Sequence, residues 1–281
     1  MCISFTKKSP TDYICLRLAS LFLSLSLLGL FESSQAGVAT QPHGAFHTHT
    51  LQSVYPDQER VISVQLPPSY LDNPDRDYPV LYILDGQNNT EMATAIVGDL
   101  VASNSMPEII IVGLHAGETR QRDYLPNNSE ARRDGMASQF LNSVEHEVLP
   151  FIESEYRTSS YRVFSGHSFG GLFTLFAFTE KPELFDGYMA QSPGLDPEWV
   201  DYFFPRIKQT FEDHPTLDTS LFVVMGNEPW WQDTFEELLV LLSEEAPDTF
   251  QWGSDKHPEA EHMETRAPGM RGGLGYIFSG Q

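Results

Sequence analysis

The chain has 281 residues, and its 39 Asp and Glu against 17 Lys and Arg give a formal net charge of −22 at pH 7. Such an acidic surface repels nucleic acid and anionic lipid, so neither is an expected partner. Both cysteines, Cys2 and Cys15, lie near the N-terminus. The rest of the chain must therefore be held by an ordinary hydrophobic core, which a chain of this length can build.

Residues 1–36 have the composition of an export signal. Basic residues precede an apolar run over residues 18–31, and Ser34-Gln35-Ala36 resembles a signal-peptidase site. The run is shorter than the roughly 18 apolar residues of a membrane-spanning helix. We therefore expect cleavage near Ala36, an exported protein (periplasmic or secreted) without stable membrane association, and a single domain over residues 37–281.

The order of apolar residues predicts an α/β fold. Residues alternate between apolar and polar over 46–54 and 60–66, which indicates an antiparallel strand pair. Continuous apolar runs, typical of buried parallel strands, follow over residues 80–84, 109–114, 163–165, 188–190 and 221–225. Helical periodicity extends over residues 137–156, with Pro150 as an expected kink, and over 235–242. We predict a mostly parallel sheet with antiparallel N-terminal edge strands and helices on both faces.

Two stretches of mixed polarity, residues 115–135 and 195–214, each follow a predicted strand. In an open parallel sheet, ligands bind outside the carboxyl ends of the strands. We therefore expect both stretches to form walls of a ligand site.

A candidate nucleophile lies in Gly166-His167-Ser168-Phe169-Gly170, a GxSxG motif between a predicted strand and an apolar helical pattern over residues 172–176. In this context the serine sits on a sharp turn that projects its hydroxyl above the sheet. Gly166 and Gly170 leave room for the strained backbone. The alternative is a glycine-rich turn with an idle serine, but the flanking strand and helix favour a catalytic Ser168.

A serine hydroxyl needs a general base, and in this arrangement the histidine comes last in the chain. His262 precedes the predicted terminal helix, whereas His257 lies in a charged stretch typical of a solvated loop, so we predict that His262 is the base. Glu228 follows the last predicted strand and is the expected carboxylate that orients His262, with Asp233 as an alternative. The other interpretation of Glu228 is a cap on the helix that begins near Trp231.

Two backbone N–H groups are predicted to hold the oxyanion that forms during ester cleavage. One belongs to Phe169, directly after the serine, and the other to Gln87, which follows Asp85-Gly86 at the end of a predicted strand. The alternative for Asp85-Gly86 is an ordinary turn. No metal or other cofactor is expected, because this chemistry needs none.

Three further side chains are candidates for substrate binding. Arg120 and Arg122 lie in an arginine-rich window after a predicted strand, and guanidinium groups can hold a carboxylate or a phosphate. Pairing with neighbouring acidic residues is the favoured alternative for both. Trp231 either lines an acyl or aromatic pocket or belongs to the core.

At these residues the chain resembles the putative-esterase, or esterase D-like, family of α/β hydrolases. Residues 78–86 resemble the family's YPVLYLLDG strand, and residues 165–173 resemble its SGHSFGGLF elbow. The resemblance implies the α/β-hydrolase fold and acyl transfer, usually to water. Similarity to the family's mycolyltransferases further implies that Gln87 supplies an oxyanion N–H. Met263-Glu264 departs from the Gly-Ser that relatives often carry after the histidine.

The sequence therefore predicts an exported serine carboxylesterase that hydrolyses a small-molecule ester through an acyl intermediate on Ser168. Residues 120–126 resemble the RxRDYTP stretch of the siderophore-esterase branch, whereas residues 194–197 depart from that branch. Because an acidic surface repels anions, we rank small acyl or aromatic esters above siderophores of the enterobactin type. The alternatives are acyl transfer to an alcohol and a non-catalytic binding protein on a hydrolase fold.

Overall fold

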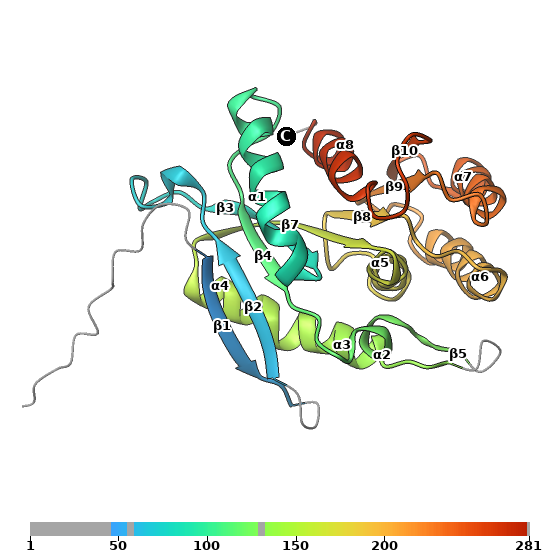
Figure 1. Ribbon diagram of the computed structural model, residues 1–281, viewed down its shortest axis with the longest axis horizontal. Helices are drawn as coiled ribbons and strands as arrows, with labels where there is room; N and C mark the ends of the chain where they lie inside the picture. The colour runs from blue at the N-terminus through green and yellow to red at the C-terminus, as the bar shows by residue number, and fades with distance from the viewer. Residues whose placement is uncertain (1–45, 55–58, 129–132, 280–281) are drawn as a thin grey trace, which may run out of the picture. The chain divides into compact units, whose positions relative to one another are not determined.

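In the computed structural model of the chain, an eight-stranded sheet with the strand order β1-β2-β4-β3-β7-β8-β9-β10 forms the centre of the fold (Figure 1). The strands are β1 (Phe46–Gln52), β2 (Glu59–Gln65), β3 (Tyr78–Leu84), β4 (Ile110–Leu114), β7 (Thr158–His167), β8 (Gly187–Gln191), β9 (Ser220–Gly226) and β10 (Gln251–His257). The strands from β4 to β10 in this order are parallel, and β1 and β2 form an antiparallel edge. This confirms the predicted sheet.

The structure describes residues 46–54, 59–128 and 133–279, which fall within one compact unit that spans Gln41–Gln281. The predicted export signal, residues 1–36, lies outside the described residues. Within the described part of the chain, no helix is both long enough and apolar enough to cross a membrane.

Successive strand residues point to opposite faces of the sheet, and helices cover both faces (Figure 1). On β3, Tyr82 and Leu84 belong to one buried cluster, whereas Leu81 and Ile83 belong to the other. The first cluster includes residues of α3 (Ala137–Ser143), α4 (Leu149–Glu155), α5 (Phe169–Glu180), α6 (Pro197–Asp213) and α7 (Gln232–Glu245). The second includes residues of α1 (Gly86–Ala102) and α8 (Arg266–Phe278). The predicted helices on both faces are thus confirmed.

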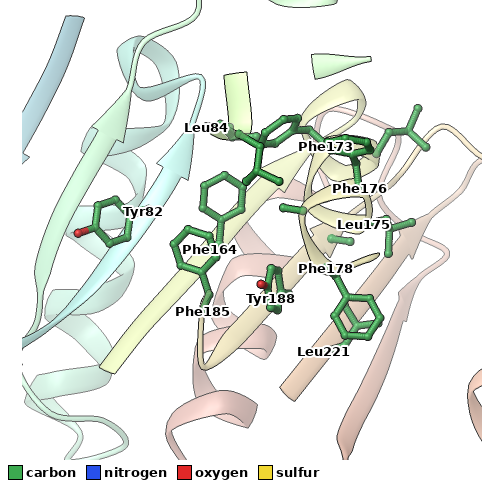
Figure 2. Packing of buried hydrophobic residues seen from close by; sticks show 14 of the residues in the cluster. Tyr82, Leu84, Phe164, Phe173, Leu175, Phe176, Phe178, Phe185, Tyr188 and Leu221 are labelled. Carbon is green, nitrogen blue, oxygen red and sulfur yellow. The ribbon is translucent and has the colours of Figure 1, made fainter. Parts of the chain in front are cut away.

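Aromatic side chains fill much of the first cluster, where β7 meets α5 (Figure 2). The ring centroids of Phe164 on β7 and Phe185 lie 4.7 Å apart, and those of Phe173 on α5 and Phe140 on α3 lie 4.9 Å apart. Each such pair contributes about 0.5–1.5 kcal/mol beyond the burial of its area. This packing fixes the strand and the helix on either side of the GxSxG motif.

The predicted helix over residues 137–156 forms as three consecutive helical segments, and its hydrogen-bonding pattern changes just before Pro150. A π-helical turn, Val144–Val148, separates α3 from α4, and Pro150 occupies the second position of α4. Proline has no N–H to donate, and its ring clashes with the carbonyl of the preceding helical turn. The wider π-turn accommodates this defect within a continuous helical path.

Strand β10 and helix α6 are among the elements that the sequence analysis did not predict. His257, expected on a solvated loop, is the last residue of β10. As an edge strand whose residues are all exposed or half-buried, β10 needs no continuous apolar run. Residues 195–214 were expected to form a wall of the ligand site, but most of them form α6, which packs on α5 and α7. Its buried Phe203, Ile207 and Phe211 recur every four residues among polar ones, so the stretch has only an overall mixed polarity.

The order of the strands creates a crevice beside β3. Its neighbour on one side is β4, and its neighbour on the other is β7. The connections that follow β3 and β7 therefore leave the sheet in opposite directions, which makes a topological switch point where ligands bind in α/β sheets. Residues 85–87 and Ser168 follow these two strands and lie at this crevice.

Candidate active site

A cavity of about 250 Å³ lies at the carboxyl ends of β3, β4 and β7. Its lining includes Gln87 after β3, Ala116 after β4 and Ser168 after β7, together with Met263 near the start of α8. Residues 115–135 thus contribute to a wall of this cavity, as predicted. A larger and mostly apolar cavity, of about 450 Å³, lies between α1, β2 and β4 and contains none of the predicted site residues in its lining.

Ser168 sits on a sharp turn between β7 and α5. Its backbone dihedrals are φ 61° and ψ −121°, and a non-glycine residue in such a conformation costs about 1–3 kcal/mol. Its N–H donates to the carbonyl of Gln191 (3.0 Å), and its own carbonyl accepts from Leu172 (3.0 Å). These bonds to β8 and α5 hold the strained residue in place.

Close backbone packing behind the serine explains one glycine of the motif. A Cβ on Gly166 would lie 2.2 Å from the carbonyl oxygen of Gly170, so only glycine fits there. At Gly170, by contrast, the nearest atom would be the Leu84 side chain at 3.3 Å. The prediction that both glycines leave room for the backbone therefore holds strictly for Gly166 only.

Glu228 and His262 form a hydrogen-bonded pair between the carboxylate and Nδ1 of the imidazole. The Glu228 side chain is fully buried (0% exposed), and its second oxygen accepts from the N–H of Gly226 at 3.0 Å. Burial alone would raise the pKa of Glu228, but hydrogen bonds from His262, Gly226 and Ser192 hold it below its ordinary value. The predicted alternative, Asp233, is exposed in the first turn of α7.

The imidazole of His262 contacts two other rings. Its centroid lies 4.6 Å from that of His167, the residue before the nucleophile, and 5.5 Å from that of Trp231. The Trp231 indole is fixed by a 2.8 Å hydrogen bond to Asp196, so this partly buried side chain supports His262. Among the described residues, the hydrogen bonds of the site do not include one between Ser168 and His262, a contact that often tightens only with substrate bound.

The two predicted oxyanion donors each lie in the first turn of a helix. Gln87 is the second residue of α1 and Phe169 the first of α5, and N–H groups at these positions have no acceptor within their own helix. Asp85-Gly86 is therefore a helix start and not an ordinary turn, with Asp85 at φ 55°. The side chain of Gln87 bonds both backbone groups of Ala116, at 2.9 and 3.0 Å, which ties this turn to the loop after β4.

Arg120 and Arg122, predicted together as substrate-binding candidates, have different positions and partners in the structure. Arg120, on α2 (Arg120–Tyr124), lines the cavity and donates two hydrogen bonds to Asp85, at 2.7 and 2.8 Å, and one to the carbonyl of His167, at 3.3 Å. Arg122 bonds Asp123 at 2.9 and 3.0 Å. Arg120 is thus held in the same cavity as Ser168 by its pairing with Asp85, whereas Arg122 orders the loop.

A buried polar network, missed by the sequence analysis, connects the nucleophile turn to the loop of His262. Nε2 of His167 donates to the carbonyl of His262 at 2.7 Å, and the Thr265 hydroxyl donates to the same carbonyl at 2.8 Å. Ser192, at φ 40°, shares a 2.9 Å hydrogen bond with Thr265. Within the described ranges, no three His, Cys, Asp or Glu side chains are grouped to hold a metal ion.

His167 is expected to make the folded state sensitive to acid. Burial first, and then the charges of His262 and Arg266, lower its pKa to about 3, from 6.5 in the unfolded chain. Between these values the unfolded chain binds one more proton, so the free energy of unfolding falls by about 1.4 kcal/mol for each pH unit lost. The full contribution is present only above pH 6.5.

Urea unfolding at pH 6.5 and 4.5 tests this, with His167→Gln as the matched variant because glutamine retains an N–H donor but does not titrate. We expect the stability advantage of the unmodified protein over the variant to shrink by about 1.4 kcal/mol per pH unit. An advantage that is the same at both pH values would contradict the lowered pKa.

The chain is similar in sequence to a known protein family and to two siderophore esterases. A family model described as Putative esterase matches residues 53–266. The ferri-bacillibactin esterase BesA of Bacillus subtilis is 30% identical over 143 residues, which cover 43% of this chain and 50% of that protein. A siderophore triacetylfusarinine C esterase of Aspergillus fumigatus is 30% identical over 129 residues, which cover 42% of this chain and 44% of that protein. The chain thus spans about half the length of these curated relatives.

Solved structures show the same fold. An IroE-like serine hydrolase from Shewanella oneidensis is similar with a TM-score of 0.72 and 27% identity, covering 83% of this chain and 80% of that one. The BES protein of Bacillus cereus has a TM-score of 0.74 at 21% identity, covering 83% and 94%. The chain has the predicted α/β-hydrolase fold, and, since the family model covers most of its length, it belongs to the Putative esterase family.

Proposed function

We propose that the chain hydrolyses carboxylic esters through an acyl intermediate on Ser168. The observation that carries this proposal is the buried Glu228–His262 pair, whose imidazole also contacts the residue before the strained serine. His262 takes the proton from the Ser168 hydroxyl while the serine oxygen attacks the ester carbonyl. His262 then gives that proton to the departing alcohol. Water, deprotonated by His262, then attacks the acyl carbonyl. The bond to the Ser168 oxygen breaks, His262 returns the proton to that oxygen, and the acid is released.

The oxyanion is proposed to lie between the N–H groups of Gln87 and Phe169. Both belong to helix starts at the cavity, where the helix dipoles also favour negative charge. Arg120 supports the same region, because its guanidinium is held by Asp85 and donates to the carbonyl next to Ser168. Glu228 keeps His262 in one orientation and stabilises the imidazolium that forms during the reaction.

Two substrate classes are candidates. The acidic surface favours small neutral acyl or aromatic esters over anionic ones. Trp231 contacts His262, and its neighbour Trp230 is 67% exposed, so an aromatic surface lies beside the proposed base. The named activities of the relatives, on ferri-bacillibactin and triacetylfusarinine C, favour siderophore esters.

An assay of the purified protein against neutral short-chain, feruloyl and catecholate esters tests the proposal. We expect hydrolysis of at least one class, and a stoichiometric mass increase on Ser168 after treatment with a phosphofluoridate. A relative has been solved in complex with DFP, a reagent of this type. Ester products formed in the presence of an added alcohol would identify transfer in place of hydrolysis, and loss of all labelling with intact fold would contradict a serine mechanism.

We also propose that the protein is exported and that residues 1–36 are removed. The support is the sequence of this segment, in which an apolar run precedes Ser34-Gln35-Ala36. The intact mass of protein recovered from outside the cytoplasm distinguishes a chain that begins at Gly37 from the uncut chain.

A further inference from the structure

We infer that Arg266 is a specificity-determining residue that binds a negatively charged group of the ester, between α1 and α8. The inference rests on the proposed ester hydrolysis at Ser168 and concerns the substrate of that same site. Arg266 is the first residue of α8 and lines the cavity that also contains Ser168, Arg120 and Gln87. Helices α1 and α8 lie side by side at this end of the sheet (Figure 1).

Neutral acceptors hold the Arg266 guanidinium in place. Its Nε donates to the carbonyl of Met263 at 3.0 Å, and its Nη1 donates to Oδ1 of Asn89 at 3.2 Å. Asn89 is itself buried and donates to the carbonyl of Leu84 at 2.9 Å. These bonds use two of the five N–H donors of a guanidinium, so an oriented cation keeps donors for a ligand in the cavity.

The charge of Arg266 differs from those of its neighbours in having no acidic partner. Arg120, in the same cavity, is neutralised by its two hydrogen bonds to Asp85. On α8 itself, Arg271 pairs with Asp99 at 2.6 Å. Within the described ranges, no Asp or Glu forms an ion pair with Arg266, whose two hydrogen bonds go to neutral oxygen atoms.

A guanidinium without an acidic partner in the cavity of Ser168 changes the expected ranking of substrates. The acidic surface lowers the encounter rate of an anionic ester at long range, but Arg266 attracts a carboxylate or phenolate once the ester reaches the cavity. Charge-assisted hydrogen bonds that a planar guanidinium donates to an anion are stronger than neutral ones. The site therefore favours an ester that carries one negative group near the cleaved bond over its neutral counterpart.

The experiment compares two esters that share the acyl group and leaving alcohol, one bearing a carboxylate and the other the corresponding amide. Arg266→Gln is expected to reduce the anionic-to-neutral ratio of kcat/KM about ten- to a hundredfold. Arg271→Gln is the matched control, because it removes one positive charge from the same helix outside the cavity, and it should leave the ratio unchanged. Arg266→Lys should retain part of the preference.

A binding measurement separates this inference from the proposed reaction. In a Ser168→Ala background, Arg266→Gln should weaken binding of the anionic ester by a similar factor, whether or not the wild-type protein turns it over. An unchanged ratio in Arg266→Gln, or an equal fall in both variants, would overturn the role of Arg266. Retention of turnover in Ser168→Ala overturns the proposed mechanism instead, while the binding comparison still decides on Arg266.

Discussion

Replacement of Ser168 by alanine is expected to lower kcat by about a thousandfold or more, which is usual for the loss of a catalytic nucleophile. Alanine lacks the hydroxyl that forms the acyl intermediate, but it has the same backbone demands and is smaller than serine. The hydrogen bonds that hold the turn, from the Ser168 N–H to Gln191 and from the Leu172 N–H to the Ser168 carbonyl, involve only backbone atoms. The variant should therefore fold normally and lose turnover.

Steady-state kinetics on the best ester from the substrate survey measures this effect, and circular dichroism with thermal unfolding confirms the fold. The variant should also fail to take up the phosphofluoridate label. Turnover close to that of the unmodified protein, in a folded variant, would exclude Ser168 as the nucleophile.

Replacement of His262 by alanine is expected to lower kcat by a similar factor, because no other group then accepts the serine proton. Glu228→Gln should cost less, by a factor of roughly ten to a hundred, since an orienting carboxylate acts only through the histidine. Glutamine retains the size of Glu228 but gives up the negative charge that stabilises the imidazolium. The ordering of these two variants is the specific signature of a base and its partner.

Asp233→Asn is the matched control for the carboxylate. Asp233 is exposed in the first turn of α7, so its loss should leave kcat close to that of the unmodified protein. If Asp233→Asn instead abolished turnover as His262→Ala does, while Glu228→Gln had no effect, the assignment of the acid would be wrong. The three variants are best measured side by side on one ester.

Patterns that depend on neighbours in the sequence predicted most of the fold. The buried strands have continuous apolar runs, and the turn at Ser168 needs glycine only because of contacts within its own motif. Strand β10 and helix α6 escaped prediction because each has one partly exposed side and therefore a mixed composition. Their structure is set by the elements against which they pack.

The residues of the site could be predicted where their order along the sequence is typical of the fold. Contacts between side chains far apart in the sequence could not. The order Ser168, Glu228, His262 along the sequence sufficed to nominate the pair that the structure brings into contact. The bond from Arg120 to Asp85 joins residues 35 positions apart, and Arg266 meets Asn89 across 177 positions. No local pattern marks such contacts, because they depend on how β3, α1 and α8 converge.

Three neighbouring strands, β3, β7 and β8, are each followed directly by a residue with positive φ that is not glycine: Asp85, Ser168 and Ser192. Each such residue costs about 1–3 kcal/mol, which is a substantial part of the 5–15 kcal/mol that stabilises a typical domain. A laboratory evolution experiment that selects for heat resistance alone should therefore collect glycine at these positions. Adaptation of this protein to higher temperature would then have to come from elsewhere in the molecule if the proposed chemistry is to survive.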